Sequence, residues 1–200
     1  MNHATTSVSP STSARWRPLH RADGSPGGSL WTGNPVHEPP PPIETWPEGR
    51  VVAWSGSLAA DDPFAEELRN WMAAGREALE IWCDRLVGPL ASTGRTLLIR
   101  PHARQLLSDV AGVVRFLRRH RGERFGMAIA PLDLLTEEMR ADGEEHLARA
   151  FEVLRPMLDP DRDLLISPAV GLDGATVEGV RERCREAAAT GGLELLIDEA

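Results

Sequence analysis

The stretch RTLLIRPH, residues 95–102, is a continuous apolar run that ends abruptly in a cation, a proline and an imidazole. Continuous rather than alternating apolar residues are typical of a strand that is buried on both faces of a parallel sheet. Arg100 and His102 follow the run at its carboxyl end, where ligands bind in parallel α/β folds. The stretch therefore predicts a buried parallel strand that delivers two polar side chains to a binding site.

Four further runs share this continuous apolar pattern, and segments with helical periodicity separate them. The runs are RVVAWSG (50–56), RFGMAIAP (124–131), DLLISPAV (163–170) and LELLIDE (193–199). The spacing predicts helices over about 62–86, 106–117, 144–158 and 175–190, the first beginning at Asp62-Pro63.

Alternating strands and helices predict a parallel α/β fold with crossover helices. Five strands are too few for a complete eight-stranded barrel of about 250 residues. We therefore expect a partial or degenerate TIM-like barrel of parallel strands, and the alternative is an open, flavodoxin-like three-layer sheet. Open sheet edges need cover, which the N-terminal part of the chain, a second copy of it or another partner would supply.

Residues 1–47 differ in composition from the rest of the chain. They hold 9 of the 16 prolines, including the run EPPPP at 38–42, and are rich in Ser, Thr and Gly. Such a segment has little apolar surface to offset the entropy lost on ordering. We predict a largely disordered or extended arm over residues 1–47, with Trp16, Trp31 and Trp46 packing locally, and an α/β domain over residues 48–200.

Composition excludes several classes of function. The net charge is −8 and all 22 basic residues are Arg, which disfavours nucleic-acid binding and leaves no lysine for Schiff-base chemistry. No apolar run approaches the ~20 residues of a membrane span, and the first residues lack the apolar core of a signal peptide. Cys83 and Cys184 fall inside predicted helices, as expected of buried thiols in a reducing compartment. We expect a cytoplasmic protein that binds neither nucleic acid nor membrane.

The carboxyl ends of the predicted strands name the candidate site residues. Each also has a structural interpretation: a rim ion pair for Arg100, a helix start for His102, a turn cap for Asp133 and a frayed terminus for Glu199. On the functional interpretation, His102, Asp133 and Glu199 are catalytic, and a second group of residues binds substrate: Arg100, Trp54 and Ser167.

The series VVAWSG, RTLLIRPH, GMAIAPLDLLTEEM and GLELLIDE resembles the sugar phosphate isomerase/epimerase superfamily, the xylose-isomerase-like TIM barrels, over residues 50–199. In that family, carboxylates and a histidine at strand ends hold a divalent metal that polarises substrate oxygens. The family's strand-end Glu corresponds to Arg100 and its Asp-Pro aspartate to Ala130. Its histidine falls near Asp133, and its last carboxylate corresponds to Asp198 or Glu199.

These substitutions affect what the resemblance implies about activity. A fixed cation at position 100 repels a divalent metal, so we expect no cofactor; the alternative is a divalent metal held despite the substitution of the expected ligands. The resemblance then implies a non-catalytic or divergent relative that binds a small sugar-like ligand. The alternative is an active isomerase or epimerase that acts on a sugar or sugar phosphate through Arg100, His102, Asp133 and Glu199.

Overall fold

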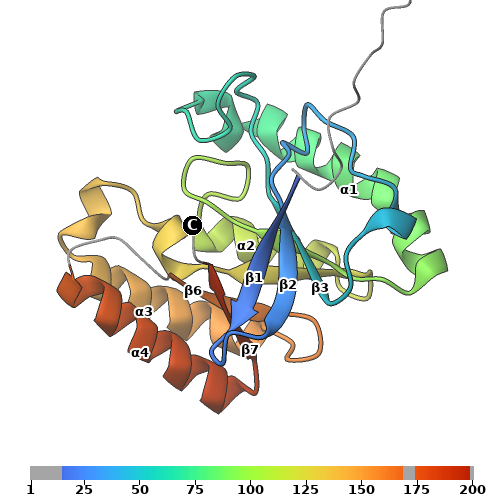
Figure 1. Cartoon of the computed structure of the whole chain (residues 1–200). Coiled ribbons are helices and arrows are strands. Elements are labelled where there is room, and N and C mark those ends of the chain that lie inside the picture. Colours follow the sequence, from blue (N-terminus) through green and yellow to red (C-terminus); the bar gives the residue numbers. More distant parts are fainter. Residues whose placement is uncertain (1–14, 169–173, 199–200) are drawn as a thin grey trace, which may run out of the picture.

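Seven strands form a closed barrel in the computed structural model, which describes residues 15–168 and 174–198 (Figure 1). Their order around the barrel follows the sequence, and β1 pairs with both β2 and β7. The strands are β1 (Trp16–Arg21), β2 (Pro26–Trp31), β3 (Arg50–Trp54), β4 (Leu97–Arg100), β5 (Phe125–Ile129), β6 (Leu164–Pro168) and β7 (Glu194–Asp198).

The barrel is mixed rather than parallel. From β2 to β7 each strand is parallel to the next one, whereas β1 is antiparallel to both β2 and β7. The prediction of a partial TIM-like barrel of parallel strands was therefore wrong, and so was the alternative of an open flavodoxin-like sheet. The reason is the hairpin β1–β2, which adds two strands and joins the edges that five parallel strands would leave open.

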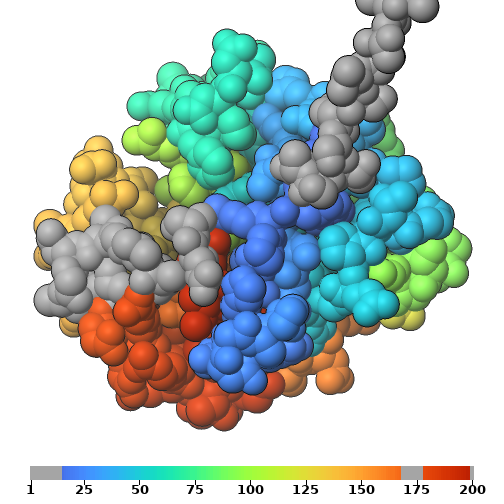
Figure 2. Space-filling view, viewed as in Figure 1, coloured from blue at the N-terminus to red at the C-terminus, as the bar shows by residue number. Residues whose placement is uncertain are grey.

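The hairpin comes from the Pro-, Gly- and Ser-rich segment that we expected to form an arm. Figure 2 shows residues of this hairpin lying against the C-terminal part of the chain. Two glycines of β2 permit close packing: a Cβ at Gly27 would lie 2.3 Å from Leu196 Cδ2, and one at Gly28 would lie 2.6 Å from the carbonyl oxygen of Arg50. Glycine is thus required at position 28, where β2 approaches the backbone of β3, whereas at position 27 a side chain would require Leu196 to shift.

Four α-helices are present in the described residues. They are α1 (Ala73–Thr93), α2 (Val110–Arg119), α3 (Gly143–Leu154) and α4 (Gly174–Gly191). Helix α1 begins eleven residues after Asp62, because Asp62 Oδ1 accepts a hydrogen bond from the Phe64 N–H and forms a local turn instead of a helix cap. The short 3₁₀ helix η3 (Leu68–Trp71) precedes α1. No described helix combines the length and apolar character needed to cross a bilayer.

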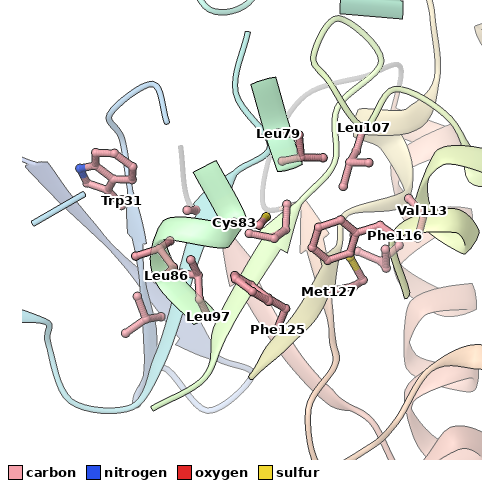
Figure 3. Packing of buried hydrophobic residues seen from close by; sticks show 14 of the residues in the cluster. Trp31, Leu79, Cys83, Leu86, Leu97, Leu107, Val113, Phe116, Phe125 and Met127 are labelled. Carbon is pink, nitrogen blue, oxygen red and sulfur yellow. The ribbon is translucent and has the colours of Figure 1, made fainter. Parts of the chain in front are cut away.

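Two apolar clusters lie on opposite faces of the sheet. One joins a side chain from every strand and fills the barrel, with Leu19, Leu30, Val52, Leu98, Ala128, Leu164 and Leu196 among its members. The other lies between the outer face of the strands and helices α1 and α2, where Phe116, Phe125 and Met127 pack close to Cys83 (Figure 3). Burial raises the pKa of the thiols of Cys83 and Cys184, that of Cys184 to about 12, and neither cysteine forms a disulfide.

Candidate functional site

Among the residues that the structure describes, four charged side chains form a network at one mouth of the barrel. Side chains alternate between the two faces of a strand, so Arg17, Arg100 and Asp198 lie on the same face as the interior residues two positions away, Leu19, Leu98 and Leu196. They form the polar layer that covers the apolar interior. Asp133 reaches this layer from the 3₁₀ helix Pro131–Leu134, which follows β5.

Arg100 is the centre of the network. Its Nε donates to Asp133 Oδ2 at 2.7 Å, and its Nη1 donates to Asp198 Oδ2 at 2.5 Å. Burial alone would lower the pKa of Arg100, but Asp133 and Asp198 outweigh it and hold that pKa above the ordinary value. Asp198 Oδ2 also accepts a hydrogen bond of 2.7 Å from Arg17 Nη2. Arg100 therefore joins two carboxylates in a largely buried, charge-balanced group.

Aromatic rings form the wall beside this group. The Arg100 guanidinium lies 4.3 Å from the centroid of the Trp54 ring, a cation–π contact. Trp54, Phe64 and His102 pack edge to face, with ring centroids 5.0–5.9 Å apart. Phe64 reaches this position because the segment before η3 is not helical.

Hydrogen bonding fixes the state of the His102 ring. Its Nδ1 accepts a hydrogen bond of 3.1 Å from the backbone N–H of Arg104. Burial, the largest cause, lowers the pKa of His102, and the cations Arg100 and Arg104 add to this effect while Asp133 opposes it. The ring is therefore neutral at pH 7, and because Nδ1 is an acceptor, Nε2 carries the proton.

Two asparagines hold the loops around the mouth in place. Asn34, after β2, donates from Nδ2 to the carbonyl oxygen of Ser57, after β3, at 2.9 Å. Asn70 accepts a hydrogen bond from the Leu58 N–H at 2.8 Å and donates to Ser57 Oγ and to the Arg104 carbonyl at 2.9 and 2.8 Å. Loops from four parts of the chain are thus connected by buried amides.

The structure brings together some of the residues expected at the site. Trp54, Arg100, His102 and Asp133 lie at the mouth. Ser167 is buried, but it alternates with the interior residue Ile166 and so lies on the outer face of β6. Glu199 lies outside the described residues.

Sequence reasoning missed Arg17 and Phe64. Arg17 is the second residue of an antiparallel strand, so a rule that considers only the carboxyl ends of parallel strands cannot find it. Phe64 falls inside the helix predicted over about 62–86, because an Asp-Pro pair before apolar residues is also a helix-start pattern. Asp62 was the one local signal for the position of Phe64, but a local turn and a helix start both use an aspartate there, so it did not distinguish them.

The neutral state of His102 predicts a dependence of stability on pH. Because burial lowers the pKa of His102 in the folded chain, the unfolded chain binds the proton more readily. The free energy of unfolding should then fall as the pH drops below the unfolded pKa of about 6.5, by less than about 1.4 kcal/mol per pH unit. Urea unfolding at pH 7.5 and 5.5 measures this loss.

The matched control for this prediction is the exposed residue His37. The loss between the two pH values should be smaller in His102→Gln than in the wild type and should be unchanged in His37→Gln. Equal losses in all three proteins would contradict the assignment to His102.

In the residues that the structure describes, no three His, Cys, Asp or Glu side chains are grouped as ligands of a metal ion would be. Comparison with known proteins identifies no relative: no family model, no curated protein and no solved structure matches this chain.

Proposed function

We propose that the chain is a non-catalytic binding protein for a small, neutral, hydroxylated ligand of the sugar class, held at the mouth of the barrel. One observation carries this proposal: the guanidinium of Arg100 bridges the carboxylates of Asp133 and Asp198. The arrangement supports binding of a polar molecule without a metal ion.

The charge balance of the mouth argues for a neutral ligand. Arg17 and Arg100 supply two positive charges, and Asp133 and Asp198 supply two negative charges. The side chains of Arg17 and Asp133 are 33% and 20% exposed, against 7% for the other two. A ligand thus meets both N–H donors and carboxylate acceptors, which is the combination that hydroxyl groups match.

The same bridge argues for binding without a metal. A divalent cation at this mouth would take its oxygen ligands from Asp133 and Asp198. One oxygen of each already accepts a hydrogen bond from Arg100, so the fixed charge of the guanidinium stands where such a cation would be placed. This supports the interpretation from the sequence that Arg100 is a fixed cation that repels a divalent metal.

The state of His102 argues for binding rather than isomerisation. A general base needs a free lone pair, but the neutral ring accepts at Nδ1 and carries its proton on Nε2. The ring is therefore suited to donate a hydrogen bond to a ligand oxygen. Trp54 and Phe64 beside it supply the apolar wall that the carbon face of a sugar ring requires.

Ligand-observed NMR with a panel of monosaccharides and their phosphates tests the proposal. A neutral monosaccharide should bind, and neither Mg²⁺ nor EDTA should change its affinity. Replacing Asp133 by Ala should weaken binding roughly tenfold or more, since a carboxylate acceptor is lost. The matched control is Asp161→Ala, which removes an exposed aspartate away from the mouth and should leave binding unchanged.

Two results would overturn the proposal. Turnover of a panel sugar that is lost in His102→Ala would establish the alternative, an active isomerase or epimerase. Binding that requires a divalent ion would show that Arg100 does not stand in place of a metal.

A further inference from the structure

A large apolar groove lies on the helical side of the molecule, separate from the charged network at the mouth. It runs between η3, the start of α2, the loop after β5 and helix α3, and has a volume of about 690 Å³. Its floor is made of buried leucines, Leu106, Leu134, Leu135 and Leu147. Among its lining residues, Asn70 also supports the loops around the mouth, but none of the four charged side chains of the network lines the groove.

Exposed apolar side chains gather at the groove. In the part of the chain that the structure describes, five large hydrophobic residues are exposed. Two of them, Trp71 (43% exposed) and Val153 (48%), line the groove, from η3 and α3 respectively. The other three, Leu68, Met72 and Ile81, do not line it. Trp71 is held at the rim by the hydrogen bond from its Nε1 to the carbonyl oxygen of Ala103, at 3.3 Å. Clustered exposure of this kind is typical of protein–protein contacts.

The groove is positively charged in an acidic chain. Arg76, Arg115 and Arg149 line it, although the net charge of the chain is −8. Arg149 pairs with Glu145, whereas within residues 15–168 and 174–198 neither Arg76 nor Arg115 has an ion-pair partner. The one carboxylate in the lining, Asp109, caps α2 by accepting from the Gly112 N–H at 2.5 Å. A ligand of this groove would therefore need negative charge to match its rim.

From these observations we propose that the groove is a docking site for an acidic amphipathic helix of a partner protein. An apolar helix face would cover the leucine floor and the exposed rim, and carboxylates along its flanks would pair with Arg76 and Arg115. A small ligand would fill the floor but would not cover the exposed side chains of Trp71 on η3 and Val153 on α3 together. The exposed rim therefore favours a macromolecular ligand.

Fluorescence anisotropy with a labelled synthetic helix tests this. The probe is a peptide of about 16 residues, roughly four helical turns, with leucine every three or four positions and glutamate or alanine elsewhere. The full chain should bind it, more weakly as salt is added. The Arg76→Glu and Arg115→Glu variants should each weaken binding roughly tenfold, and Trp71→Ser should weaken it at least as much.

Matched variants outside the groove serve as controls: Arg118→Glu on the same helix as Arg115, and Ile81→Ser, which removes an exposed hydrophobic residue that does not line the groove. Both should bind the probe as the wild type does. Circular dichroism establishes that each variant is folded.

Three results would overturn the proposal: no binding of the glutamate peptide, equal binding of a peptide with lysine in place of glutamate, or equal loss in the control variants. Sedimentation adds a fourth. A dimer of the wild type that dissociates in Trp71→Ser would show that a second copy of the chain, and not a foreign helix, occupies the groove.

Discussion

Replacing Arg100 by Met should lower the free energy of unfolding by about 3–5 kcal/mol. The substitution keeps the length of the apolar stem but removes the guanidinium that bridges Asp133 and Asp198. Asp198, which is 7% exposed, would keep Arg17 but lose its buried partner, and two carboxylates would then face the space that the guanidinium had filled. Urea unfolding at pH 7 measures the loss.

A surface ion pair supplies the control for Arg100. Arg69 pairs with Glu67 at 2.7 Å, but its side chain is 60% exposed, so Arg69→Met should cost less than about 1 kcal/mol. A cost for Arg100→Met no larger than that for Arg69→Met would show that the buried network contributes little. If the guanidinium stands in place of a cation, millimolar Mg²⁺ should restore part of the stability of Arg100→Met and leave the wild type unchanged.

Replacing Asn70 by Ala should lower the free energy of unfolding by about 2–4 kcal/mol, because three hydrogen-bonding groups lose their buried partner. Those groups are the Leu58 N–H, the Ser57 hydroxyl and the Arg104 carbonyl, and Asn70 itself is 1% exposed. Since the three belong to loops around the mouth, sugar binding should weaken together with stability.

An Asp at position 70 distinguishes the hydrogen bonds from the side-chain volume. Asn70→Asp keeps the shape but turns the donor Nδ2 into an acceptor facing the Arg104 carbonyl oxygen. It should therefore destabilise at least as much as Asn70→Ala. Near-wild-type stability of Asn70→Asp would contradict the assigned orientation of the amide.

Local sequence patterns were informative where burial is complete. The five strands from β3 to β7 coincide with the five continuous apolar runs, because a strand covered on both faces has no polar side chains to interrupt its pattern. The starts of helices α3 and α4 were likewise placed within about a turn. Helix α1 was misplaced, since a turn at Asp62 and a helix cap share the same residues.

What the sequence by itself determined is thus the five parallel strands from β3 to β7 and the carboxyl ends where Trp54, Arg100 and His102 lie. What the tertiary structure decided is that the sheet closes into a barrel. The hairpin WRPLHR and PGGSLW, residues 16–21 and 26–31, has weak strand propensity and forms strands because β3 and β7 offer unpaired edges. That closure also brings Arg17 to Asp198, a pair 181 residues apart in the sequence, which no local pattern could indicate.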